Sequence, residues 1–274
     1  MIVEIAKEKM KSINQLSSLE GRVACVTGAS GNIGNSICEA ILEAKGSLIM
    51  IDNNSESLEF VSTDHEKKYD SKIVSFCSDL SDSQERKLLL QEINKTERVD
   101  ILVNCAAFVG DSDLQGWTSS FIEQDPDLWS KVLELNLVAP FHLSQGLNQK
   151  LSADGNGSII NISSIYGFMA PDMSLYEDTN MGNPAAYSAS KGGLIQLTKW
   201  LAVNMAPSVR VNSISPGGIE RDQPKAFIEK YQAKTPLGRM GSEEDLKGSI
   251  IFLASDLSKY VTGQNIIVDG GWSC

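Results

Sequence analysis

Two residues with acid–base side chains, Tyr187 and Lys191, stand four positions apart at the start of a long helical pattern. On a helix this spacing puts both side chains on one face, so the Lys191 ammonium can lie beside the Tyr187 phenol. A free tyrosine titrates near pH ~10, and a cation about 4–5 Å away at an effective dielectric of about 20 contributes roughly 3–4 kcal/mol, enough to lower that pKa toward neutrality. The pair predicts a proton-transfer catalyst. Because the same spacing is common among unrelated exposed residues, the rest of the chain has to decide.

Three glycines, Gly28, Gly31 and Gly34, follow the first apolar run and open directly into a helical pattern. Glycines at these places allow a tight turn, a close approach of the backbone to a pyrophosphate, and close packing of the helix on the strand. The N-terminus of the helix then faces the phosphates. The turn predicts a dinucleotide-binding site, although a glycine trio also occurs in plain turns.

An acidic residue, Asp52, ends the second expected strand eighteen positions after Gly34. A carboxylate at this place can accept hydrogen bonds from an adenosine ribose, and it repels a 2′-phosphate. No Arg or Lys occupies the glycine turn or closely follows Asp52 in the sequence. We therefore predict NAD(H) over NADP(H) as the cofactor, the alternative for Asp52 being a helix-capping or turn aspartate.

The composition limits the class of protein. The chain has 274 residues, 42% hydrophobic and 22% charged, and a formal net charge of −11. This acidic balance argues against nucleic acid or an anionic membrane as partner and suits the binding of small molecules. Every apolar run is shorter than the ~18–20 residues that span a bilayer, and the first residues lack the apolar core of a signal peptide.

The cysteines and histidines predict neither disulfides nor a metal site. Five cysteines are an odd number, and none forms a Cys-x-x-Cys pair, as is typical of reduced thiols in a cytoplasmic protein. His65 and His142 fall in expected helices with no Cys or carboxylate at ligand spacing, so we interpret them as surface or packing residues.

From Arg22 onward, short β-rich runs alternate with helical patterns. This alternation predicts a doubly wound (Rossmann) α/β fold, a seven-stranded parallel sheet with helices on both faces, as a single domain over residues 21–274. Residues 1–20 are expected to form a charged helical extension. The expected strands are 23–27, 47–51, 72–77, 100–104, 157–163, 209–214 and 264–268, and the expected helices are 32–44, 58–69, 83–94, 126–147, 187–206, 224–234 and 243–254.

With these elements in place, the chain resembles the short-chain dehydrogenase/reductase family over essentially all of residues 21–274. Besides the glycine turn and the Tyr187–Lys191 pair, further family-like blocks appear in order along the chain. They are Asp79-Leu80, Asn104-Cys105-Ala106-Ala107, Leu135-Asn136-Leu137, residues 157–164, residues 210–217 and residues 268–271.

The resemblance implies a role for each residue of a catalytic set. Tyr187 would be the general base in alcohol oxidation and the general acid in ketone reduction, and Lys191 would lower its pKa and hold the cofactor ribose. Ser164, with Ser163 as the alternative, would donate a hydrogen bond to the reacting oxygen. Asn136 would hold a water that links Lys191 to solvent. The predicted cofactor-binding residues are Gly28, Ser30, Gly31, Asn32, Ile33, Gly34, Asp52, Asn53, Asp79, Leu80, Asn104, Ala106, Tyr187, Lys191, Pro216, Gly217 and Ile219.

Two departures from the family pattern concern the glycine turn and the catalytic region. The spacing Gly-x-x-Gly-x-x-Gly resembles the extended branch of sugar-nucleotide epimerases and dehydratases, whereas the chain length and the Asp269-Gly270-Gly271 ending resemble the short branch. The gap of 23 positions between Ser164 and Tyr187 is longer than is usual in the family. Its added polar and aromatic residues, within 166–182, suggest a hydroxyl-rich substrate or a subunit contact.

A third departure is Arg221, which stands where the family often has a threonine. It could bind a phosphate or carboxylate of the substrate, or pair with Glu220 or Asp222 at the surface.

The leading hypothesis is an oxidoreductase that transfers hydride between NAD(H) and a secondary alcohol or ketone, in a sugar or sugar derivative. The sequence also resembles a subgroup associated with sugars of bacterial surfaces and flagellins. One alternative is a sugar-nucleotide epimerase or dehydratase that keeps NAD bound, and another is a non-catalytic cofactor-binding scaffold. The family resemblance further implies a homotetramer or homodimer built through the helices that contain Asn136 and Tyr187.

Overall fold

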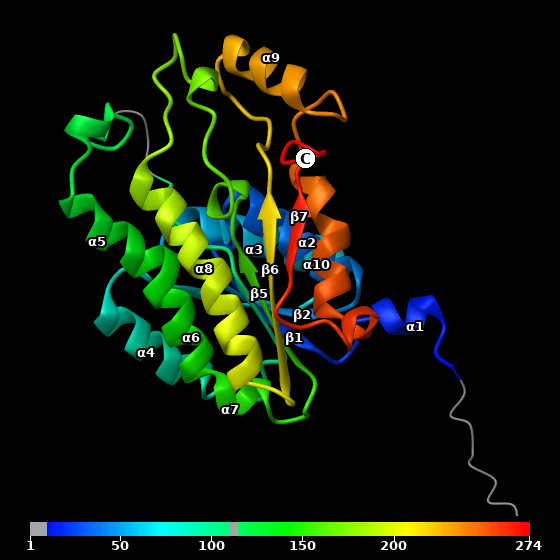
Figure 1. The fold of residues 1–274 in the computed structure, drawn as a ribbon. Helices are drawn as coiled ribbons and strands as arrows, with labels where there is room; N and C mark the ends of the chain where they lie inside the picture. Colours follow the sequence, from blue (N-terminus) through cyan, green and yellow to red (C-terminus); the bar gives the residue numbers. More distant parts are fainter. Residues whose placement is uncertain (1–9, 110–113) are drawn as a thin grey trace, which may run out of the picture.

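The computed structural model describes residues 10–109 and 114–274. Seven parallel strands form one sheet in the order β3-β2-β1-β4-β5-β6-β7, and helices cover both of its faces (Figure 1). This confirms the doubly wound fold. The strands are β1 (Val23–Thr27), β2 (Ser47–Asp52), β3 (Val74–Cys77), β4 (Ile101–Asn104), β5 (Gly157–Ile162), β6 (Val209–Pro216) and β7 (Asn265–Val268).

Alternate side chains of the central strands pack against opposite helical layers. Ala24 and Val26 of β1 belong to the core under one layer, and Cys25 belongs to the core under the other, as the period of two of a strand requires. The first layer consists of α2 (Asn32–Glu43), α3 (Ser55–Tyr69) and α10 (Lys247–Ala254), and the second contains α4 (Ser83–Ile93), α6 (Ala139–Gly146), α7 (Asn148–Leu151) and α8 (Ala185–Asn204).

The expected single helix over residues 126–147 is wrong in its middle. The structure has α5 (Asp127–Leu133), a π-helical segment Glu134–Val138, and then α6. Pro140 supplies a reason, because a proline has no N–H to donate to the carbonyl of Asn136 four residues earlier. The Ala139 N–H instead donates to the Glu134 carbonyl five residues back, and Asn136 lies within this widened turn.

In the described part of the N-terminal region, the helix is shorter than expected. Helix α1 covers only Ile13–Ser17 and begins with a capping box at Ser12. Leu19 follows it and is fully buried in the core under α2 and α10. The rest of the expected extension, residues 1–9, lies outside the described residues.

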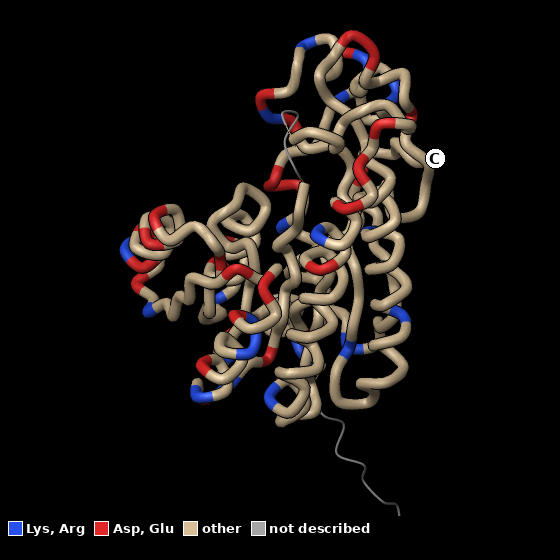
Figure 2. The backbone as a smooth tube through the Cα atoms, turned by 90° about the vertical axis from the view of Figure 1, so that its left-hand side faces the viewer, with Lys and Arg blue, Asp and Glu red and all other residues tan. Residues whose placement is uncertain are grey.

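The remaining described helices are peripheral. A short helix, α9 (Lys225–Lys234), lies above the carboxyl ends of β6 and β7 (Figure 1). Lys and Arg are interspersed with Asp and Glu along the outer helices and loops (Figure 2). None of the helices in the described ranges is long and apolar enough to cross a membrane.

The topology fixes where a ligand can bind. The strand order reverses between β1 and β4, because β2 and β3 lie on one side of β1 while β4 to β7 lie on the other. In such sheets the connections at this switch point diverge and leave a crevice beyond the carboxyl ends of the strands. The glycine turn after β1 and the segment after β4 border this crevice.

Candidate active site

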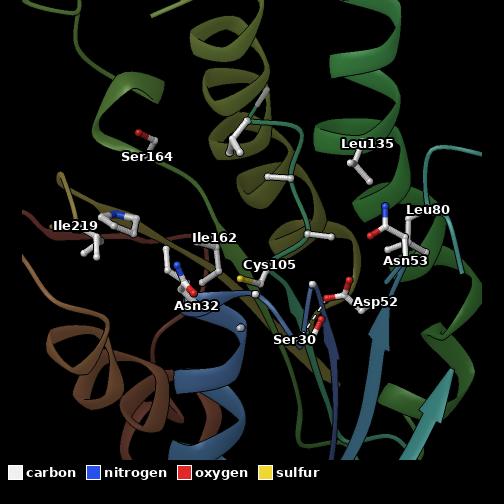
Figure 3. Close-up of a pocket in the computed structure, with 18 of the residues that line it drawn as sticks. Ser30, Asn32, Asp52, Asn53, Leu80, Cys105, Leu135, Ile162, Ser164 and Ile219 are labelled. Carbon is white, nitrogen blue, oxygen red and sulfur yellow. Dashed lines mark hydrogen bonds between the residues drawn. The ribbon is translucent and has the colours of Figure 1, made fainter. Parts of the chain in front are cut away.

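A cleft of about 590 Å³ lies at the switch point (Figure 3). Its volume is within the usual range of about 300–1,000 Å³ for small-molecule sites. All predicted cofactor-binding residues except Asn104 line it, together with Ser164. The lining residues that were not among the predicted cofactor-binding or catalytic residues are Asn54, Ser57, Ser78, Cys105, Ala107, Val109, Leu135, Ile162, Ser163 and Arg221, of which Ser163 was the alternative catalytic serine and Arg221 a candidate anion-binding residue.

The glycine turn has the geometry that a phosphate cradle requires. A Cβ on Gly34 would lie 1.9 Å from the Gly28 carbonyl oxygen, and a Cβ on Gly28 would lie 2.9 Å from Ala106, so side chains at these places are excluded. Gly28 also has a φ of +64°, which favours glycine. Helix α2 starts at the cleft with Gly31 as N-cap, which provides no side chain to cap its N–H groups. These residues fit the diphosphate of a dinucleotide.

Asp52 stands at the end of β2 with its carboxylate turned toward the glycine turn (Figure 3). Its Oδ2 accepts a hydrogen bond from the Ser30 N–H at 3.0 Å, and its Oδ1 accepts one from the Asn54 N–H at 3.2 Å. Each oxygen keeps a further lone pair. Among the described residues that line the cleft, the only cations are Lys191 and Arg221.

Tyr187, Lys191 and Ser164 meet at the other end of the cleft. Lys191 is 3% exposed, its Nζ donates to the Ile162 carbonyl at 2.8 Å, and it lies 5.7 Å from the centre of the Tyr187 ring. Burial lowers the pKa of Lys191 to about 8. Burial also raises the pKa of Tyr187, although a hydrogen bond with the Ser164 side chain acts in the opposite direction.

The raised pKa of Tyr187 differs from the expectation that Lys191 lowers it. A buried phenolate is poorly solvated, and the same burial weakens the protonation of Lys191. The chain's own groups therefore hold both side chains closer to their neutral forms than in water. A low tyrosine pKa would require further positive charge beside the ring.

The two serines after β5 point in different directions. The Ser163 hydroxyl donates to the Lys191 carbonyl at 2.9 Å and ties β5 to α8. The Ser164 hydroxyl accepts from the Tyr166 N–H at 3.2 Å and lies on the side of Tyr187. Of the two, Ser164 has the geometry to meet a reacting oxygen.

Asn136 is buried, and its side chain does not line the cleft. Its Oδ1 accepts from the Phe108 N–H at 2.6 Å, while its Nδ2 donates to the Phe108 carbonyl at 3.2 Å and to the Ser190 hydroxyl at 3.0 Å. Both amide hydrogens are therefore used in joining the segment after β4 to α8. A water linked to Lys191 would have to donate to an oxygen of Asn136, either Oδ1, which keeps a lone pair, or the main-chain carbonyl, to which Pro140 offers no N–H.

Asn104, the predicted residue that does not line the cleft, supports it from behind. Its Nδ2 donates to Asn161 Oδ1 at 2.8 Å, and the Asn161 amide donates to the Thr198 hydroxyl at 2.9 Å. This relay joins β4, β5 and α8, so Asn104 positions the cleft wall.

The added segment after Ser164 is fastened to α9. The Tyr166 and Tyr176 hydroxyls lie 2.8 Å apart. Lys230 donates to the carbonyls of Ser174 and Glu177, each at 3.1 Å, and Lys234 pairs with Asp172. Within this segment Tyr176 lies close enough to Tyr187 to help raise the pKa of its phenol, whereas none of residues 166–182 lines the cleft itself.

Arg221 forms an ion pair that the sequence did not predict. Its Nε donates to Glu243 Oε1 at 3.0 Å, and not to the neighbouring Glu220 or Asp222. Glu243 begins a 3₁₀ turn 22 positions away, so sequence proximity gave no signal for this pair.

The two histidines lie in helices away from the cleft lining. His65 is buried on α3, and His142 Nδ1 accepts from Arg86 at 3.3 Å. In the described ranges, no group of three or more His, Cys, Asp or Glu residues could hold a metal ion.

Comparison with known proteins decides the family. Residues 28–273 match the family model described as enoyl-(acyl carrier protein) reductase. A post-translational flagellin modification protein A of Campylobacter coli is 34% identical over 93% of this chain and 99% of its own length. The chain belongs to the short-chain dehydrogenase/reductase family. It is therefore an oxidoreductase of the hydride-transfer type, of the classical branch and not the extended one.

Other members of the short-chain dehydrogenase/reductase family act on varied substrates. The 3-oxoacyl-[acyl-carrier-protein] reductase FabG of Aquifex aeolicus is 34% identical over 92% of this chain and 98% of its own. A galactitol 2-dehydrogenase (L-tagatose-forming) of Cereibacter sphaeroides is 31% identical over 93% of this chain and 96% of its own.

Solved family members bind either nicotinamide dinucleotide. A short-chain dehydrogenase from Leptospira borgpetersenii with bound NAD+ has a TM-score of 0.82 and 34% identity, covering 97% of this chain and 98% of its own. A gluconate 5-dehydrogenase from Burkholderia cenocepacia in complex with NADP and tartrate has a TM-score of 0.83 and 27% identity, covering 95% and 98%.

The burial of Lys191 predicts a specific dependence of stability on pH. Because its pKa falls from 10.5 to about 8 on folding, protonated Lys191 opposes folding by ~3 kcal/mol at pH 7. Between pH 8 and 10.5 Lys191 is more protonated in the unfolded chain than in the folded one. The destabilising contribution of Lys191 to folding therefore disappears as the pH rises through this range. Urea unfolding at pH 7 and pH 9.5 should show that Lys191→Met gains stability relative to wild type at pH 7 and that this gain shrinks by about 2 kcal/mol at pH 9.5.

The matched control is Lys225→Met, because the Lys225 side chain is 89% exposed. It should show no pH-dependent difference from wild type. A difference for Lys191→Met that stays constant between the two pH values would contradict a lowered pKa.

Proposed function

We propose that this protein is an NAD(H)-dependent oxidoreductase that interconverts a secondary alcohol and a ketone in a sugar or sugar derivative. The observation that carries the proposal is the joint placement of Ser164, Tyr187 and Lys191 at one end of a cleft whose other end has the glycine turn and Asp52. A scaffold that only binds a cofactor has no need of this hydroxyl, phenol and buried ammonium together.

The side chains have complementary roles in the proposed reaction. Ser164 donates a hydrogen bond to the substrate oxygen, and Tyr187 takes the alcohol proton or gives it back. Lys191, held by the Ile162 carbonyl, stabilises the phenolate and has donors left for the cofactor ribose. Bound NAD(H) supplies or accepts the hydride, and the positive ring of NAD+ favours phenolate formation.

The preference for NAD(H) over NADP(H) rests on Asp52. Its carboxylate lies where the adenosine ribose would sit, and a 2′-phosphate there would meet a negative charge. The two cations of the cleft lining come from the other half of the sheet: Lys191 lies in α8, between β5 and β6, and Arg221 follows β6. Asp52 lies on β2, on the opposite side of β1. Because similar proteins bind NAD+ or NADP, the proposed preference is supported by the residues of this chain alone.

The sugar-type substrate rests on the segment between Ser164 and Tyr187. The Tyr176 hydroxyl of this segment lies near Tyr187 and is 2.8 Å from the Tyr166 hydroxyl, and such hydroxyls suit a substrate with several hydroxyls better than an acyl chain. The flagellin modification protein and the galactitol dehydrogenase among the relatives agree with this substrate class, whereas the 3-oxoacyl reductase offers an acyl substrate as the competing outcome.

The cofactor preference is tested by titrating the protein with NADH and with NADPH while following nicotinamide fluorescence. Wild type should bind NADH at least tenfold more tightly. Asp52→Ala should weaken the binding of NADH and reduce the preference for NADH over NADPH to below about threefold. The reason is that the ribose acceptor and the repulsion of a 2′-phosphate are both lost.

Asp64→Ala removes an equal charge from an exposed position of α3 that does not line the cleft, and it should leave both affinities unchanged. Equal binding of NADH and NADPH to wild type would refute the preference.

Turnover is tested with a panel of polyols and aldonates beside 3-oxoacyl thioesters. Tyr187→Phe should bind NADH within about threefold of wild type but lose about 10²–10⁴-fold in kcat, because only the acid–base group is removed. Tyr260→Phe, at a fully exposed tyrosine, should retain wild-type kcat. Turnover of thioesters alone would contradict the sugar assignment, and bound NAD that cycles without net absorbance change would favour an epimerase or dehydratase.

We further propose a homo-oligomer formed through the neighbouring helices α5, α6 and α8 (Figure 1). Phe141 of α6 and Trp200 of α8 form a tilted aromatic pair with ring centres 6.4 Å apart. Trp200 is 53% exposed and Val203 is 78% exposed. Large apolar side chains clustered on one face are typical of a subunit contact.

Light scattering after size-exclusion chromatography should give a dimer or tetramer for wild type and a smaller species for Trp200→Glu, because a charge would be buried in the contact. Phe60→Glu, on α3 and 76% exposed, should leave the mass unchanged. A monomeric wild type would rule out the assembly.

A further inference from the structure

Arg221 lies at the entrance of the cleft, next to the first turn of α2. Ile219 forms a parallel bridge with Gly241, and the Glu220 N–H donates to the Gly241 carbonyl at 2.8 Å. These bonds fix the turn that carries Arg221 against the segment leading to Glu243. Figure 3 shows Ile219 and Asn32 on the same side of the view, opposite Asp52 and Leu80.

Glu243 is itself fastened to α2. Its carbonyl accepts from the Ser36 hydroxyl, in the second turn of that helix, at 3.1 Å. Arg221 pairs with the side chain of Glu243, so its guanidinium is held beside the N-terminal part of α2. Arg221 and Asn32 accordingly line both the cleft and the more open hollow on its outer side.

Arg221 and the N-terminus of α2 therefore border the same space. The first N–H groups of α2 are directed at the cleft and carry the positive end of the helix dipole. The charge of Arg221 also acts inside the cleft. Burial raises the pKa of the Cys105 thiol to about 12, while the charges of Lys191 and Arg221 act to lower it.

We propose that Arg221 binds the diphosphate of NAD(H) and exchanges its ion pair with Glu243 for this contact. The inference rests on the proposed cofactor and goes beyond it by assigning a specific anion-binding residue where the family often has a threonine. Glu243 is then the resting partner of the guanidinium and competes with the cofactor for it.

The exchange is favourable on physical grounds. The Arg221 and Glu243 side chains are 41% and 26% exposed, and an ion pair accessible to solvent contributes little to stability. A diphosphate against the N–H groups of α2 offers two negative charges and pairs of oxygens that the planar guanidinium can bind in bidentate fashion. The turn that carries Arg221 already borders the cleft, so the exchange asks for a new side-chain conformation at a residue that is already in place.

The same geometry favours the cofactor over a substrate phosphate as the anion. Arg221 is fixed beside the helix that starts at the glycine turn, whereas the reacting centre is marked by Ser164 and Tyr187. An anionic group on the substrate remains the competing outcome of the experiment.

The test measures the dissociation constants of NADH by fluorescence and those of ADP and adenosine by displacement of NADH. Adenosine shares the base and ribose but has no phosphate. Arg221→Ala should raise the dissociation constants of NADH and ADP about tenfold, which is about 1.4 kcal/mol. The dissociation constant of adenosine should change by less than twofold. Lys225→Ala, which removes the same charge from an exposed site of α9 outside the cleft, should change none of the three.

Glu243→Gln provides a second arm, because it frees the guanidinium without removing it. It should lower the dissociation constant of NADH by about two- to fivefold, and this gain in affinity should vanish in the double variant with Arg221→Ala. NADH binding to Arg221→Ala within twofold of wild type, or an equal loss for adenosine, overturns the assignment of Arg221 alone. Absence of NADH binding to wild type overturns the proposed cofactor as well.

Discussion

The ammonium of Lys191 is the group that the surrounding structure has to accommodate, because a buried cation is unstable unless it is well coordinated. The Ile162 carbonyl accepts one of its hydrogens at the end of β5. The next residue, Ser163, bonds back to the Lys191 carbonyl. Gly167 then approaches the same backbone so closely that a Cβ there would lie 2.8 Å from the Lys191 carbonyl. Strand β5, the turn after it and α8 are thus locked together at one point, and this lock also aligns Ser164 with Tyr187.

Most of the fold was predictable because its signals are local. Buried parallel strands appear as short apolar runs, and the structure places strands at all seven expected sites. The interruption of the helix around Asn136 was missed, although Pro140 was visible in the sequence, because the pattern of apolar residues alone continues through it. Helix α3 begins at Ser55, three residues before the expected start at 58, because Asn54 caps it by accepting from the Ser57 N–H.

The site was harder to predict wherever a side chain depends on a partner distant in the sequence. The lining of the cleft followed from the motifs, because the backbone of a glycine turn determines its own shape. The bonds of Asn136 to Phe108, the support of Asn104 by Asn161 and the pairing of Arg221 with Glu243 did not follow, because the fold alone brings these residues together. The pKa of Tyr187 is a similar case: the helical spacing revealed the nearby cation but not the extent of burial, and burial has the larger effect.

Helix α9 contacts two segments that border the site: the added segment after Ser164 and the turn that leads to Arg221. On one side its lysines hold the added segment, through Lys230 to the Ser174 carbonyl and through Lys234 to Asp172. On the other side the Tyr231 hydroxyl accepts from the Gly218 N–H at 2.6 Å, in the turn that leads to Ile219 and Arg221. A shift of α9 would therefore move the segment above Tyr187 together with the turn that borders the cofactor cleft. In a chain with a net charge of −11, local positive charge at that cleft must come from a few groups, and the turn that α9 steadies carries one of the two cations in its described lining.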